Sequence, residues 1–142
     1  MIASALPLVF IVAAIVLLGV TGNLFSTSPF AIAAQVAAVA LNVWARVSFQ
    51  KGTFRVTAAP GGTSIIRRGP YRFIRHPMYA AALLFVWAAV ASHPSTWTLA
   101  IGVAGTALVI PRVFAEERLL RATYPEYLDY SRSTKALIPY VF

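Results

Sequence analysis

Charged residues are absent from two long stretches of this chain, and this distribution limits the possible folds more than any other feature. The 12 basic and 4 acidic residues all lie in 46–75 and 112–135, which leaves 1–45 and 76–111 without a single Lys, Arg, Asp or Glu. Only 11% of the chain is charged, whereas a soluble domain carries about 25%. A soluble domain of this size cannot bury two apolar stretches of this length in its core, so we predict an integral membrane protein.

Polar interruptions divide the apolar blocks into four segments. We therefore predict an all-α fold, a polytopic membrane bundle of about four transmembrane helices followed by a cytoplasmic C-terminal helical segment. The expected spans are near the short end of what crosses a hydrocarbon layer of about 30 Å. They lie at about residues 5–22, 30–46, 77–92 and 96–113, with C-terminal helices over 114–132, all in one domain over 1–142. A cleaved signal peptide is not expected, because no basic residue precedes the first apolar run.

The basic residues also predict an orientation. Both charged segments are rich in Arg and Lys, whereas the other two connections, near 21–29 and 92–96, carry no charge. The side of a membrane protein that is rich in Arg and Lys normally faces the cytoplasm. An even number of spans then places both termini in the cytoplasm, and we expect a bacterial or archaeal inner membrane. The net charge of +8 is explained by this topology and by attraction to anionic membrane lipids, without a nucleic acid.

Several kinds of chemistry are excluded by what the sequence lacks. The chain has no cysteine and two histidines, His76 and His93. Disulfides, thiolate catalysis and cysteine-ligated metals are therefore absent, and we expect no metal site. No Gly-rich phosphate loop, Ser–His–Asp set or H-x-x-x-H pattern occurs either. A catalytic site in this chain must rely on arginines, carboxylates, tyrosines and one histidine.

The stretch from Gly69 to Tyr79 carries the first candidate site. His76 precedes a proline and should be extended, whereas Pro77 suits the first turn of a helix. A helix that begins at Pro77 presents free N–H groups and the positive end of its dipole beside Arg75. This combination favours binding of an anion.

The second candidate site is the adjacent acidic pair Glu116-Glu117. Neighbouring residues on a helix project about 100° apart, so at most one of these carboxylates can point into a given pocket. The structural alternative is a solvated helix face with an i, i+4 pair such as Glu117 with Arg121. Topology places the pair on the same membrane face as Arg75 and His76. In the second span, Gln35 and Asn42 share one face, and we expect them to form interhelical hydrogen bonds rather than ligand contacts.

These residues together resemble a known family. The R-H-P-x-Y stretch at 75–79, the E-E-x-x-L stretch at 116–120 and the Y-x-x-Y stretch at 127–130 are similar, in this order, to the isoprenylcysteine carboxyl methyltransferase and phospholipid methyltransferase superfamily. The resemblance covers about residues 60–140. It implies a small membrane enzyme that uses S-adenosylmethionine to methylate a lipid-like acceptor. One departure is Ala81, where many members have glycine, which leaves the pocket more crowded.

The resemblance also implies which residues form the site. The cofactor is expected between the R-H-P segment, the glutamate pair and the C-terminal helices. The expected cofactor-binding residues are Tyr71, Arg75, His76, Pro77, Tyr79, Glu116, Glu117, Tyr127 and Tyr130. The expected catalytic residues are Arg75 and Glu117, together with Arg46, which lies outside the resemblance and is expected from its charge alone. Physical chemistry agrees, because the cofactor's carboxylate suits Arg75, its amino group and ribose suit a glutamate, and its sulfonium suits aromatic rings. Arg46 or Arg55 would orient an anionic acceptor.

Three questions stay open at this stage. The acceptor is either the carboxylate of a prenylated cysteine-like compound or the amine of a phospholipid. His76 either contacts the cofactor or only caps its helix. Two other functions also compete: an NADPH-dependent sterol or lipid reductase, whose related motif has asparagine where this chain has Met78, and a non-catalytic lipid-binding bundle.

Overall fold

The computed structural model describes residues 2–50 and 65–138, and its regular elements are helices. They are α1 (Ile2–Val20), α2 (Pro29–Gln50), the short 3-10 helix η1 (Gly69–Arg72), α3 (Pro77–Ser92), α4 (Thr96–Thr123) and α5 (Tyr127–Ser133). Extended pairing within these residues is limited to one parallel bridge between Ile74 and Lys135. The predicted all-α class is confirmed for the described part of the chain. Arg55, a candidate for orienting the acceptor, lies outside it.

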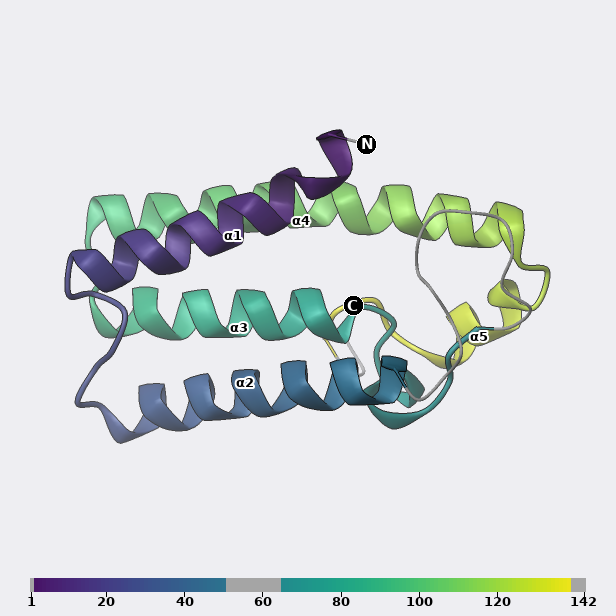
Figure 1. Cartoon of the computed structure of the whole chain (residues 1–142), viewed down its shortest axis with the longest axis horizontal. Helices are drawn as coiled ribbons and strands as arrows, with labels where there is room; N and C mark the ends of the chain where they lie inside the picture. Colours follow the sequence, from purple (N-terminus) through teal and green to yellow (C-terminus); the bar gives the residue numbers. More distant parts are fainter. Residues whose placement is uncertain (1, 51–64, 139–142) are drawn as a thin grey trace.

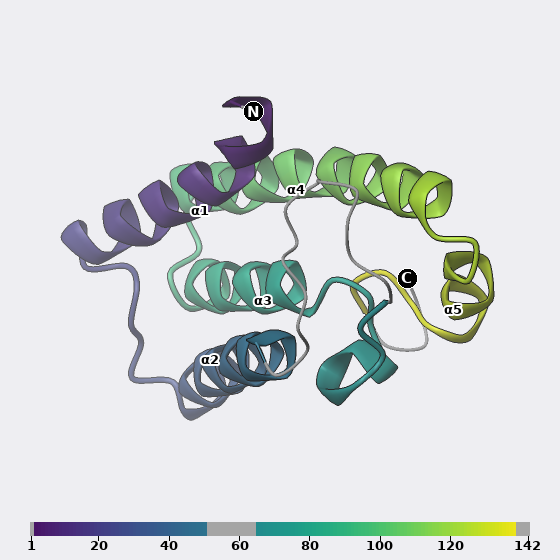
Figure 2. The same cartoon turned by 45° about the vertical axis from the view of Figure 1, so that its right-hand side comes forward.

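Helix α3 occupies the middle of the bundle. Helix α1 lies on one side of it and α2 on the other, while α4 runs along α1 and also packs against α3 (Figures 1 and 2). The start of α3 and the ends of α2 and α4 meet at one end of the bundle, next to η1 and α5 (Figure 1). Segments far apart in the sequence therefore converge at this end.

Within the residues that the structure describes, two helices are long and apolar enough to cross a membrane, α2 over Pro29–Ser48 and α4 over Thr96–Thr123. Shorter apolar helices are formed by Val9–Val20 of α1 and by α3. Large apolar side chains stay exposed on α1 and α2, as expected for helices that face lipid; examples are Val16, Phe30 and Val36. The arrangement in four spans and the orientation of the termini stay predictions.

The fourth predicted span and the first C-terminal helix form one continuous helix, α4. It ends at Thr123 because Tyr124 precedes a proline, and steric contact with the proline ring favours an extended backbone at that position. Tyr124 has φ −123° and ψ 109°. The chain then turns back, so that α5 contacts α4 and the residues after α5 pair with the segment before α3.

Close contacts fix the helices that frame the site. A Cβ atom on Gly102 of α4 would lie 3.2 Å from the ring of Trp87 on α3, so the glycine permits this packing. Gly69 has φ +60°, and its Cβ would lie 2.0 Å from the Ser48 hydroxyl, so η1 can rest on α2 only with glycine there. Gln35 is buried and donates to the carbonyl of Leu24 at 2.6 Å. The expected interhelical hydrogen bond is thus wrong for Gln35, because its partner lies in the connection before α2, although the bond is structural as expected.

Candidate functional site

The R-H-P segment begins α3 as the sequence predicts. Pro77 is the first helical residue, and His76 is the N-cap residue with φ −121° and ψ 60°. The backbone N–H groups of Arg75 and His76 donate to the carbonyls of Lys135 and Ala136 at 2.8 and 3.0 Å. The chain after α5 therefore holds this segment in place, and its side chains face α4 and α5.

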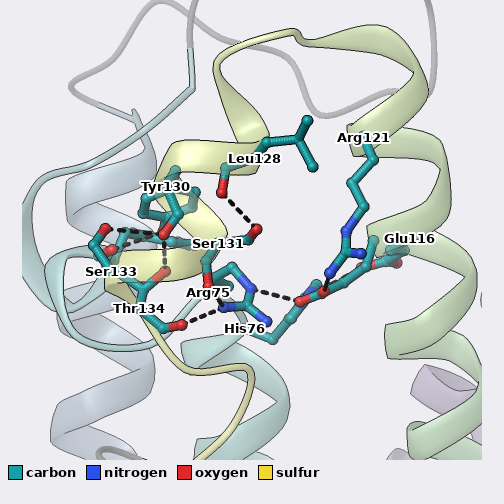
Figure 3. A network of polar contacts seen from close by, with 11 residues as sticks. Arg75, His76, Glu116, Arg121, Leu128, Tyr130, Ser131, Ser133 and Thr134 are labelled. Atoms are coloured by element: carbon teal, nitrogen blue, oxygen red, sulfur yellow. Dashed lines mark hydrogen bonds and ion pairs between the residues drawn. The ribbon is translucent and has the colours of Figure 1, made fainter.

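Arg75 and Glu117 form a buried ion pair. Arg75 Nε lies 2.5 Å from Glu117 Oε1, and each side chain is only 9% exposed. Arg75 Nη1 also donates to the carbonyls of Ser131 (3.0 Å) and Thr134 at the end of α5 (Figure 3). Arg121 approaches the other oxygen of Glu117 at 3.3 Å, the i, i+4 pair that the sequence suggests. Arg75 thus joins the segment before α3 to the C-terminal part of α4 and to the end of α5.

Glu116 has a different set of partners. It accepts a hydrogen bond from the Tyr79 hydroxyl at 2.9 Å and pairs with Arg112 at 2.8 Å. The two glutamates therefore point in different directions, as their helical spacing requires. Glu116 lines the cavity described below, whereas Glu117 is turned toward Arg75 and is not part of the lining.

His76 lies between the two carboxylates. Its Nδ1 is 3.5 Å from Glu116, and its Nε2 is 3.5 Å from Glu117. Burial lowers the pKa of His76, but hydrogen bonding and charge interactions with both glutamates outweigh it and raise the pKa above the ordinary value of 6.5. His76 also caps α3 through its carbonyl, which accepts from Ala80 N–H at 3.0 Å. The backbone of His76 thus caps the helix, while its side chain bridges the glutamates.

A cavity of about 790 Å³ extends from this network into the bundle. One end is polar, and the predicted site residues that line the cavity are Arg46, Tyr71, Arg75, His76, Pro77, Tyr79, Glu116, Tyr127 and Tyr130. The remainder is mainly apolar and runs between α1 and α2, over residues such as Ile15, Val39, Val43 and Phe85. Ala81 also lines it. Among the described residues, no group of three or more His, Asp or Glu is placed to hold a metal ion.

Three tyrosines form one wall of the polar end. The rings of Tyr127 and Tyr130 meet edge to face, 5.8 Å apart, and Tyr130 donates to the carbonyl of Tyr71 at 2.7 Å. Burial raises the pKa of Tyr71 to about 12 and those of Tyr127 and Tyr130 further, so all three remain protonated donors. The Tyr127 hydroxyl is buried yet makes no hydrogen bond to any described residue.

Arg46 lies on α2 at the wall of the same cavity. Its Nε donates to Oδ1 of Asn42, one turn earlier, at 2.8 Å. Asn42 also lines the cavity. The expectation of an interhelical hydrogen bond is wrong for Asn42, because Arg46 offers a donor on the same helix at the i, i+4 spacing.

Several residues of the network were missed by sequence reasoning. Arg112 is i, i+4 to Glu116, so its helical spacing was a usable signal. The carbonyls of Ser131 and Thr134 gave no such signal, because any residue type carries a carbonyl group. Their role depends on how the chain after α5 returns to α3.

Comparisons with known proteins give matches to a family model and to curated proteins. The model of a family described as phospholipid methyltransferase matches residues 30–127. The chain is 34% identical over 77 residues to a cobalt-zinc-cadmium resistance protein, CzcN, of Cupriavidus metallidurans. It is 35% identical over 78 residues to a nickel-cobalt-cadmium resistance protein, NccN, of Alcaligenes xylosoxydans xylosoxydans. Each match covers 54% of this chain but only 36% and 37% of those two proteins. No solved structure matches the chain significantly.

Proposed function

This chain belongs to the phospholipid methyltransferase family, and from that premise we propose that it transfers a methyl group from S-adenosylmethionine to a lipid-like acceptor. One observation supports this proposal most directly: a single cavity joins a charged, tyrosine-lined end to an apolar groove between helices. A polar cofactor and a lipid-like acceptor require these two environments side by side. The volume of about 790 Å³ lies in the range of ligand pockets, about 300–1,000 Å³.

An unpaired polar atom supports the presence of a polar ligand. The Tyr127 hydroxyl is buried without a hydrogen bond among the described residues, and Tyr127 lines the cavity. Buried polar groups are nearly always hydrogen-bonded in folded proteins. S-adenosylmethionine carries a carboxylate, hydroxyls and ring nitrogens that can supply the missing partners, so the residues fit this cofactor.

The charges suggest how the chain holds the cofactor. Glu116 is the carboxylate of the pair that lines the cavity, so we assign it to the amino group or the ribose hydroxyls. Arg75 and His76 are the donors for the carboxylate, and the tyrosine rings face the adenine and the positive sulfur. Glu117 acts through Arg75, which it positions. When bound, the cofactor supplies a methyl group that a nucleophile can accept, with the sulfonium sulfur as the leaving group. The residues of the chain contribute orientation, and no covalent nucleophile of the protein is needed.

We place the polar end of the cavity at the cytoplasmic face of a bacterial or archaeal inner membrane. The basic residues around η1 and the end of α4 favour that side. The apolar groove opens among helices that carry exposed valines, so an acceptor can keep its tail in the hydrocarbon layer. The acceptor head would then meet the cofactor at the membrane surface.

Calorimetric titration of the detergent-purified protein with S-adenosylhomocysteine and, separately, with NADPH tests this proposal. We expect S-adenosylhomocysteine to bind and NADPH not to bind. Tyr127→Phe should weaken binding about tenfold without loss of stability, because the hydroxyl has no partner to lose. Tyr130→Phe is the matched control, and it should cost stability because Tyr130 donates to Tyr71. Binding of NADPH alone would move the assignment to a reductase, and binding of neither would favour a non-catalytic bundle.

A further inference from the structure

The two oxygens of the Glu116 carboxylate are engaged unequally. Oε1 accepts the hydrogen bond from the Tyr79 hydroxyl at 2.9 Å and lies 2.8 Å from Nη2 of Arg112. Oε2 lies 3.5 Å from Nδ1 of His76, farther than the distance of about 2.7–3.2 Å that is usual for an N–H···O hydrogen bond. Oε2 is therefore the oxygen of Glu116 that is better able to accept a hydrogen bond from a ligand.

Arg112 reaches Glu116 from outside the cavity. Tyr79 and Glu116 both line the cavity, whereas Arg112 is not among the described residues of its lining. Arg112 precedes Glu116 by four residues on α4, the spacing that brings two side chains together on one face of a helix. Its buried Nε makes no hydrogen bond within the described part of the chain, and its Nη2 is the atom that approaches the carboxylate. Of the two groups that hold Oε1, Arg112 is thus the one outside the cavity wall.

We propose that Arg112 is a positioning residue, which holds Oε1 of Glu116 and thereby turns Oε2 toward the cofactor. This inference rests on the proposed function, in which Glu116 binds the amino group or the ribose hydroxyls of the cofactor. A glutamate side chain has several rotamers, and a charge-assisted bond from a guanidinium selects one of them. Without Arg112, the carboxylate can shift toward His76, and Oε2 is then used within the network instead of by the ligand.

The exposure of this ion pair distinguishes positioning from a purely structural role. The side chains of Arg112 and Glu116 are 28% and 27% exposed, compared with 9% for each partner of the Arg75–Glu117 pair. Ion pairs that water reaches contribute little to the stability of a fold. A side chain that is ordered before its ligand arrives nevertheless binds that ligand more tightly. The Arg112–Glu116 pair should therefore affect ligand binding more than folding.

A double-mutant cycle tests whether Arg112 acts through Glu116. Calorimetry would measure the affinity for S-adenosylhomocysteine of the detergent-purified wild-type protein, Arg112→Gln, Glu116→Gln and the double variant. We expect each single substitution to weaken binding about tenfold, a typical coupling between neighbouring residues. Adding Arg112→Gln to Glu116→Gln should change the affinity less than about twofold, because Arg112 then has no carboxylate to hold.

Two further variants serve as controls. Arg118→Gln removes the same charge from an exposed position on α4 outside the cavity lining, and it should leave the affinity within about twofold of wild type. Arg112→Lys keeps the charge beside Glu116 and should retain most of the affinity. Without ligand, the melting temperature of Arg112→Gln should lie within about 4 °C of wild type. If Glu116→Gln alone abolishes detectable binding, recovery in Arg112→Lys relative to Arg112→Gln decides in favour of the inference, and its absence decides against it.

Equal affinity of wild type and Arg112→Gln would overturn the inference. A loss that persists in the Glu116→Gln background would also overturn it, because Arg112 would then contact the ligand itself. An Arg112→Gln protein that does not fold would assign the ion pair to stability instead. In all three cases the proposed function would stand, because binding to the wild-type protein is measured separately. A wild-type protein that does not bind S-adenosylhomocysteine would overturn both.

Discussion

The two ends of the cavity are built from different interactions. At the polar end, hydrogen bonds and ion pairs join segments 37 to 59 residues apart, as between Tyr79 and Glu116 or Arg75 and Thr134. In the groove between α1 and α2, the walls are mainly valine, isoleucine and phenylalanine side chains that lack any polar link. Polar bonds between distant segments therefore join the polar end, whereas the groove is bounded by apolar side chains alone.

This difference suggests how each end treats its ligand. Polar contacts are directional, so the polar end holds its donors and acceptors in one arrangement and suits a ligand of fixed shape. Apolar contacts are not directional, and their strength depends on the area removed from water. For the proposed lipid-like acceptor, the groove therefore suits a tail whose length and branching can vary, and the residues at the polar end would select the head group.

Among substitutions that compare the two ends of the cavity, Arg75→Gln at the polar end is expected to change the free energy of unfolding most. The change removes one partner of a buried ion pair and leaves Glu117 only 9% exposed, so it should destabilise the protein by about 3–5 kcal/mol. It should also abolish binding of S-adenosylhomocysteine. Unfolding in detergent, followed by circular dichroism, measures the first effect and calorimetry the second.

Arg121→Gln is the control, since this arginine pairs with the same glutamate but is 51% exposed. It should cost about 0–1 kcal/mol. If both substitutions had equal effects, the buried pair would not be what holds the polar end together.

An intermediate effect is expected from pH. The pKa of His76 in the folded protein is raised above its ordinary value of 6.5 by Glu116 and Glu117. A raised pKa means that the protonated form stabilises the fold; this contribution is complete below about pH 6.5 and is lost as the pH rises through the folded-state pKa. The free energy of unfolding of the ligand-free protein should therefore decrease as the pH rises above neutrality. In His76→Gln the same pH series should be flatter, and parallel curves for the two proteins would show that His76 is not responsible.

The smallest effect on stability is expected in the groove. Val43 lines the cavity and is 54% exposed, so Val43→Trp should change the free energy of unfolding by no more than about 0.5 kcal/mol. It should nevertheless slow methyl transfer to a lipid-like acceptor several-fold, because the indole occupies the proposed path of the acceptor tail. Val36→Trp is the control on the same helix, 62% exposed and outside the cavity lining. A change in binding of S-adenosylhomocysteine in Val43→Trp would contradict the separation of the two ends.

Local chemistry made part of this site predictable. A proline fixes its own φ and restricts the residue before it, so the start of α3 at Pro77 could be inferred from two residues. Helical spacing likewise showed that only one of Glu116 and Glu117 can face a pocket. It could not show which, because that depends on where α3 and α5 lie relative to α4.

Long-range contacts account for what the sequence left undetermined. The bridge between Ile74 and Lys135 and the bonds from Arg75 to carbonyls after α5 join residues that share no pattern. The free hydroxyl of Tyr127 is a similar case, because a Y-x-x-Y motif does not reveal that Tyr130 has a partner and Tyr127 has none. The positions of the apolar helices in the described residues could be predicted from hydropathy, but the partners at the polar end required the tertiary structure.

The pairing of residues 73–76 with 135–136 has a consequence for synthesis of the protein. Translation produces Arg75 and His76 well before the segment whose carbonyls hold them. The groove between α1, α2 and α3 can form while the ribosome is still at work, but the charged end closes only after residue 136 has emerged. During that interval the nascent chain has the apolar groove without the polar end. The proposed cofactor site is therefore incomplete until residues 135–136 pair with the segment before α3.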